Sequence, residues 1–149
     1  RVLCKKSLSY MKGTMFENEG VTYLFVGLKK DKEKLERNNY KDKFLSASMF
    51  QWESENNTTV SNKIGVKLLN TSIVHLFVRK MDSEDGITLP FTYFGTGHFT
   101  NMRDSQVEIF DKKTLSISFA KTLLFDVMLD NSVDEKYYFD FEIPHEEKL

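Results

Sequence analysis

The chain has 149 residues, of which 40% are hydrophobic and 29% charged, with two prolines and one cysteine. This length predicts a single domain over residues 1–149, the lone Cys4 excludes an internal disulfide and a cysteine-rich metal cluster, and no apolar run reaches the about 18 residues of a membrane span. The net charge of −1 hides a division, because residues 1–80 carry fifteen Lys or Arg against eight Asp or Glu, whereas residues 81–149 carry six against fourteen.

The first half of the chain contains short apolar runs rich in aromatic residues, which favour strands over long helices. The run VTYLFVGLK (21–29) predicts a strand, and KDKEKLERNN (30–39) predicts a solvated loop or a turn of helix. The segment YKDKFLSASMFQWESEN (40–56) fits two strands around a turn, and its aromatic residues either belong to the core or line a pocket for a flat ligand. ESENNTTVSN (53–62) has the composition of a loop.

The second half continues the β-rich pattern. KIGVKLL (63–69) and IVHLFVRK (73–80) fit a hairpin, MDSEDG (81–86) fits a turn, and ITLPFTYFGTG (87–97) fits a strand with Pro90 at an edge or bulge. Four further short strands are expected, at QVEIFDKK (106–113), LSISF (115–119), TLLFDVML (122–129) and KYYFDFEI (136–143), of which TLLFDVML also fits a short helix. About eight strands predict a mainly β (β-rich α+β) fold, a curved, partly open barrel or a sandwich.

Signals for catalysis are weak. GTG (95–97) lacks the following Lys and helix of a phosphate-binding loop, and His75, His98 and His145 do not have metal-ligand spacing. His75 lies in an apolar run, where a sheet-face or core position is expected. A binding module is therefore favoured over an enzyme, and the single cysteine favours a reducing, cytoplasmic location. The lack of a long apolar run predicts no membrane partner. The charge division favours an acidic partner such as nucleic acid for the basic half.

Several pieces occur in a fixed order between Tyr23 and Gly97, namely YKDKFLS, FQWESENNT, KIGV, LFVRK and PFTYFG. In this order they resemble the C-terminal target-recognition domain of SauUSI-type type IV restriction endonucleases, the domain of unknown function at the C-terminus of bacterial superfamily II helicases. The chain begins without an initiator Met, and with this resemblance we expect it to be a fragment from the C-terminus of a larger protein.

The resemblance implies an SRA/PUA-like fold that recognises double-stranded DNA containing 5-methylcytosine or 5-hydroxymethylcytosine, by turning the base out of the duplex. It also implies that the domain itself is no enzyme and needs no cofactor or metal. ATP and a divalent metal would serve the helicase and nuclease domains of the same chain.

A pocket for a modified cytosine needs flat side chains for stacking and an acceptor for the exocyclic amine. On the resemblance, Tyr40 and Trp52 are candidates for the stacking pair and Asp42 for the acceptor. The alternative places Trp52 in the core and Asp42 in a solvated turn. Three phenylalanines are expected in the core, namely Phe44, Phe50 and Phe77.

The loop after Trp52 supplies candidates for contacts to base edges or phosphates, which are Ser54, Asn56, Asn57 and Thr58, although such side chains also bond their own backbone. Basic residues of the first half are candidates for phosphate contacts, with Arg79 preferred for its bidentate fork. The others are Lys29, Lys30, Lys41, Lys43, Lys63, Lys67 and Lys80.

Three other functions remain open on the sequence. A protein-coupling module that docks on a helicase motor would place Trp52 at an interdomain surface. A PUA-like RNA-binding domain would read single strands or 2′-hydroxyl groups. A catalytic domain would need its acidic residues clustered around a metal.

Overall fold

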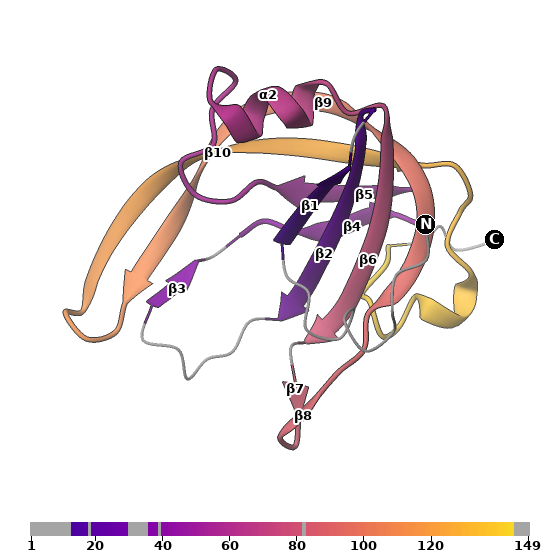
Figure 1. The fold of residues 1–149 in the computed structure, drawn as a ribbon. Helices are drawn as coiled ribbons and strands as arrows, with labels where there is room; N and C mark the ends of the chain where they lie inside the picture. Colours follow the sequence, from indigo (N-terminus) through magenta and orange to yellow (C-terminus); the bar gives the residue numbers. More distant parts are fainter. Residues whose placement is uncertain (1–12, 18, 30–35, 39, 82, 145–149) are drawn as a thin grey trace.

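The computed structural model describes residues 13–17, 19–29, 36–38, 40–81 and 83–144. Within these residues one curved sheet of eight strands dominates (Figure 1), in the order β1-β2-β6-β9-β10-β5-β4, with β3 added on β9. The strands are β1 Gly13–Glu17, β2 Val21–Lys29, β3 Glu36–Asn38, β4 Lys43–Ser46, β5 Met49–Glu53, β6 Ile73–Met81, β9 Thr92–Asp111 and β10 Ser116–Leu129. A separate small hairpin pairs β7 Ser83–Glu84 with β8 Ile87–Thr88.

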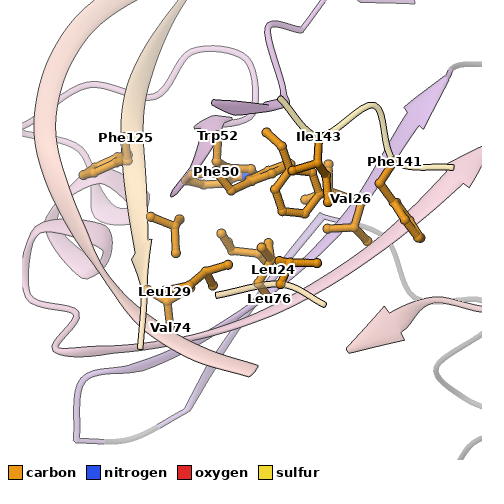
Figure 2. Packing of buried hydrophobic residues seen from close by; sticks show 14 of the residues in the cluster. Leu24, Val26, Phe50, Trp52, Val74, Leu76, Phe125, Leu129, Phe141 and Ile143 are labelled. Carbon is orange, nitrogen blue, oxygen red and sulfur yellow. The ribbon is translucent and has the colours of Figure 1, made fainter. Parts of the chain in front are cut away.

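Among the strands that the structure describes, only β2 and β6 pair in parallel, and the other pairings in the sheet are antiparallel. One buried cluster takes residues from both ends of this strand order, such as Leu24 on β2 and Phe50 on β5. Figure 2 shows these side chains meeting across the interior. The sheet therefore curls around its core, and the predicted mainly β, curved, SRA/PUA-like class is confirmed.

The core follows the alternation of the strands. In β2 and β6, Leu24 and Leu76 point into the main cluster, while Tyr23 and Phe77 belong to a second cluster on the other face. The expected burial of Phe44, Phe50 and Phe77 is confirmed. His75 also lies on the second face, stacked on Tyr23 with ring centroids 4.6 Å apart, which agrees with a sheet-face histidine.

The prediction of a strand at residues 63–69 is wrong, because they form helix α2, Lys63–Leu69. Asn62 caps the helix, since its Oδ1 accepts from the backbone N–H of Gly65 at 2.9 Å. Ile64 and Leu68 lie four residues apart and both pack on the core, a helical period that a seven-residue window does not distinguish from a strand. The helix lies over one end of the curved sheet in Figure 1.

The strands expected at 106–113, 115–119 and 122–129 are parts of two long strands. β9 continues from Thr92 through Gly95 and Gly97 to Asp111, and β10 joins SISF to TLLFDVML, with Leu115 in the turn before it. The last expected strand, at 136–143, is wrong, because the segment holds the 3₁₀ helix η1 Glu135–Tyr137 followed by turns. Asp134 caps η1, and Phe141 and Ile143 then return into the core.

Candidate nucleic-acid interface

A groove of about 890 Å³ lies between the loop after β5 and the outer part of the β9–β10 pair. The chain reaches it from four separate places, residues 41, 58–60, 104–108 and 119–122. Its walls are Lys41, Thr58, Thr59, Val60, Asp104, Ser105, Gln106, Glu108, Phe119, Lys121 and Thr122. This volume is within the range of about 300–1,000 Å³ of small-molecule sites, so the groove can receive a ligand of the size of a nucleobase.

Lys41 is fixed at the groove by a buried carboxylate. Glu53 is buried and accepts from the Lys41 backbone N–H at 2.9 Å, from Lys41 Nζ at 3.4 Å and from the hydroxyl of Thr122. Lys41 Nζ also donates to the carbonyl oxygen of Gln106 at 2.6 Å. The Lys41 side chain is 44% exposed, so it is held in position while still accessible to a ligand.

The loop that forms the opposite wall is tied to β10. The backbone N–H of Ser54 donates to Leu123 O, the N–H of Leu123 donates to Ser54 Oγ, both at 2.8 Å, and the N–H of Thr58 donates to Lys121 O at 3.2 Å. Ser54 and Thr58 are both buried. Ser54 therefore has a structural role and no surface for DNA, whereas Thr58 contributes to the groove wall.

Tyr40 and Asn56 form a hydrogen-bonded pair beside the groove but are not among its lining residues. The Tyr40 hydroxyl donates to Asn56 Oδ1 at 2.6 Å. Burial raises the pKa of Tyr40 to about 12, a hydrogen bond with the backbone of Asn56 opposes the rise, and the nearby carboxylates of Asp42, Glu53 and Glu55 add to it. The next loop residue, Asn57, is exposed with φ of +64°, a conformation that Asn tolerates well.

Asp42 and Trp52 occupy structural positions. Asp42 Oδ1 accepts from the backbone N–H of Glu53 at 2.7 Å and so extends the β4–β5 pairing. Trp52 is only 4% exposed and packs on Phe99 and Phe125, with centroids 5.7 and 6.0 Å away. Neither lines the groove. The core alternative therefore describes Trp52, and we correct its assignment as a stacking residue.

The basic candidates separate by exposure. Lys43, Lys63 and Lys67 are exposed, and Lys80 is half-buried. Arg79 is 3% exposed, lies over the Phe91 ring at 4.4 Å and donates to Leu89 O at 3.2 Å, so its preferred role as a phosphate contact is corrected to a packing role. Lys30 and the side chain of Lys29 are outside the described part of the chain.

The sequence did not single out Phe119, Lys121, Gln106 or Val60 as site residues, although all four line the groove. Phe119 is 58% exposed although it lies in a β strand. Alternation along LSISF places Leu115, Ile117 and Phe119 on one face, a signal that fits a core face equally well. An exposed face can be distinguished from a core face here only in the structure, where the β9–β10 pair extends away from the core.

The groove mixes charges of both signs with apolar surface. Lys41 and Lys121 are cationic donors, Asp104 and Glu108 bring carboxylates, and Phe119 brings an exposed ring. Donors and acceptors beside a ring can hydrogen-bond the edge of a heterocycle while the ring covers its face. Among the described residues, no group of three His, Cys, Asp or Glu could hold a metal, and no helix is long and apolar enough to cross a membrane.

The fold is similar to that of MspJI restriction endonuclease, solved in complex with a 27-mer oligonucleotide. The two align with a TM-score of 0.50 and 12% identity over 74% of this chain, and the alignment spans 29% of the MspJI chain. This similarity concerns the fold. No curated protein matches the sequence at a significant level. Residues 3–141 match the family described as Domain of unknown function (DUF3427), and the chain therefore belongs to that family.

Proposed function

We propose that this chain recognises DNA that contains modified cytosine, as the target-recognition module of a modification-dependent restriction enzyme. The groove beside Lys41 carries the proposal, because it combines a ring, fixed donors and carboxylates in a space large enough to admit a base. The similarity of the fold to MspJI, whose structure is a complex with an oligonucleotide, supports the same partner class.

In the proposed complex the modified cytosine leaves the duplex and enters the groove. Phe119 stacks on the base, which contributes about 1–3 kcal/mol. A carboxylate of Asp104 or Glu108 accepts from the exocyclic amine, and the ammonium of Lys41 or Lys121 donates to the ring carbonyl. Val60, which is 45% exposed, offers apolar surface to a methyl group on C5.

The wider assignment follows the sequence resemblance. We propose that the chain works in the cytoplasm as part of a SauUSI-type type IV restriction endonuclease, whose helicase and nuclease domains use ATP and a divalent metal. The module itself binds and positions DNA and carries out no chemistry.

Binding of the 149-residue chain to matched duplexes with cytosine, 5-methylcytosine or 5-hydroxymethylcytosine tests the proposal. Phe119→Ala should weaken binding to the preferred modified duplex by roughly 5- to 150-fold, the equivalent of one lost stack, and should change binding to the unmodified duplex far less. Fluorescence anisotropy at two salt concentrations measures both effects.

Phe139→Ala is the matched control, because Phe139 is also an exposed phenylalanine, at 92%, and does not line the groove. This variant should bind every duplex like the parent chain. Equal affinity of the parent chain for the three duplexes would contradict the proposal. Absence of DNA binding would instead favour the second candidate, a protein-coupling module, for which Phe139 and the exposed acids Glu135, Asp140 and Glu142 offer a docking surface.

A further inference from the structure

The paired ends of β9 and β10 extend beyond the core as an arm, which we define as residues 108–119. Val107, which pairs with Ala120, is the last fully buried residue before it. Four residue pairs follow, from Glu108 with Phe119 to Asp111 with Ser116, a length of roughly 13 Å at 3.3–3.4 Å per residue. Figure 1 shows the hairpin end standing away from the rest of the sheet, with β3 along its β9 edge.

The arm exposes three large apolar side chains that are near one another. Leu115 is 77% exposed, and Ile117 and Phe119 are each 58% exposed. Ile117 and Phe119 lie on the same face of β10 because side chains alternate along a strand. Phe119 also lines the groove, so this apolar face is continuous with the proposed base site.

Leu115 is held in an unfavourable backbone conformation. Its φ is +54°, in the left-handed region that favours glycine, and a leucine there costs roughly 1–2 kcal/mol. The turn is nevertheless well defined, because Asp111 Oδ1 accepts from the backbone N–H groups of Lys113 and Thr114, at 2.9 and 3.4 Å. A strained, exposed leucine at the tip of an ordered turn has no stabilising role for the chain alone, which points to a role in binding.

Residues 108–119 are neutral as a whole, with Lys112 and Lys113 against Glu108 and Asp111, but the two lysines are gathered at the turn. Residues 81–149 carry six Lys or Arg, and three of them, Lys112, Lys113 and Lys121, lie at the tip or base of the arm. All three side chains are exposed. Apolar side chains flanked by lysines match the minor groove of a duplex, where apolar wedges act on base steps and cations meet the adjacent phosphates.

We propose that the arm is a second DNA-binding element, which places Leu115 and Ile117 in the minor groove beside the target site and bends the duplex. This inference rests on the proposed function for the nature of the partner, but not on the reading of the modified base. The minor groove is about 6 Å wide, narrower than a strand pair with β3 on its edge, so the strands stay outside and only side chains at the end of the arm enter it.

Leu115→Gly tests the arm without damaging the fold. Glycine adopts positive φ freely, so the variant should melt at the same temperature as the parent chain or higher. Ile117→Ser removes the second apolar side chain, and Ser118→Ala on the opposite face is the matched control. The probe is a 5-methylcytosine duplex with a fluorescent donor and acceptor at its two ends, read by energy transfer, with affinity measured in the same titration.

The parent chain should increase energy transfer, and Leu115→Gly combined with Ile117→Ser should abolish the increase and lower affinity at least tenfold. The preference of this double variant for modified over unmodified duplex should remain, because the groove is intact.

A parent chain that binds DNA without bending it, or variants that bend DNA normally, would overturn only the proposed role of the arm. A parent chain that binds modified and unmodified duplexes equally would overturn the proposed function. The energy-transfer measurement would still test the arm in that case. A change of oligomeric state in the variants, measured by sedimentation, would assign the face to protein contacts and overturn the inference, and absence of DNA binding would overturn both.

Discussion

Among single residues, Glu53 connects the candidate site to the sheet through hydrogen bonds. It is buried at the end of β5, and its carboxylate accepts from Lys41 and Thr122, which both line the groove. A buried carboxylate is stable only when its oxygens are paired, so the positions of Lys41 and Thr122 follow from one desolvated charge.

Thr122→Val should therefore lower the free energy of unfolding by about 1.5–3 kcal/mol, because it removes a hydroxyl donor from a buried charged acceptor while keeping the side-chain shape. Urea denaturation measures the loss. Thr59→Val is the control, since the Thr59 hydroxyl contacts Ser61 Oγ at 3.4 Å in an exposed loop, and its change should stay within about 0.5 kcal/mol. Equal losses in the two variants would contradict the role of Glu53.

Tyr40 gives a pH dependence with a defined sign. Its pKa is raised from 10.0 to about 12 in the folded chain, chiefly by burial, so between these values the folded state holds a proton that the unfolded state has released. The stability associated with Tyr40 is present below pH 10 and is lost as the pH rises toward 12. Tyr40→Phe should show a smaller fall in stability between pH 9 and pH 11.5 than the parent chain, as measured by urea denaturation at both values. An identical fall would show that Tyr40 titrates normally.

At the scale of elements, helix α2 supports the groove wall formed by residues 58–60. Gly65 in the helix packs against the carbonyl oxygen of Thr59, and a Cβ at that position would overlap this oxygen. The helix and the loop therefore approach each other more closely than any residue with a side chain allows. This close contact depends on Gly65. The motif KIGV shows the glycine but does not show that it packs against the loop.

Gly65→Ala stabilises an ordinary helix by roughly 0.5–1 kcal/mol, but here it should destabilise the chain by about 1–3 kcal/mol, because the loop has to move. Val66→Ala, at an exposed position of the same helix, is the control and should change stability little. Thermal unfolding of both variants measures the difference. A Gly65→Ala chain as stable as the parent would mean that the loop yields without cost.

At the scale of the whole molecule, the sequence predicted the fold class better than the site. Phe44 and Phe50 could be assigned to the core because they alternate in short apolar runs, and the curved β class followed from many such runs. The groove could not be predicted, because Lys41, Val60, Gln106 and Phe119 meet only after the sheet has curled. The same composition that made Trp52 a stacking candidate also suits a core position, and only burial separates the two.

The parallel pairing of β2 with β6 has a consequence for how the molecule folds. The paired residues of β2 and β6 are 52 positions apart in the sequence, so this contact closes a long intervening segment of the chain. Closing a flexible loop of about 50 residues opposes folding by roughly 3.5 kcal/mol in its length-dependent term, at (3/2)RT ln n. The β4–β5 hairpin and α2 are local structures inside that segment and shorten the flexible length when they form first. Such non-local pairing is associated with slow folding. Lys41 and Val60 lie between β2 and β6 in the chain, whereas Gln106 and Phe119 lie beyond β6, so the groove depends on a second non-local pairing, that of β5 with β10.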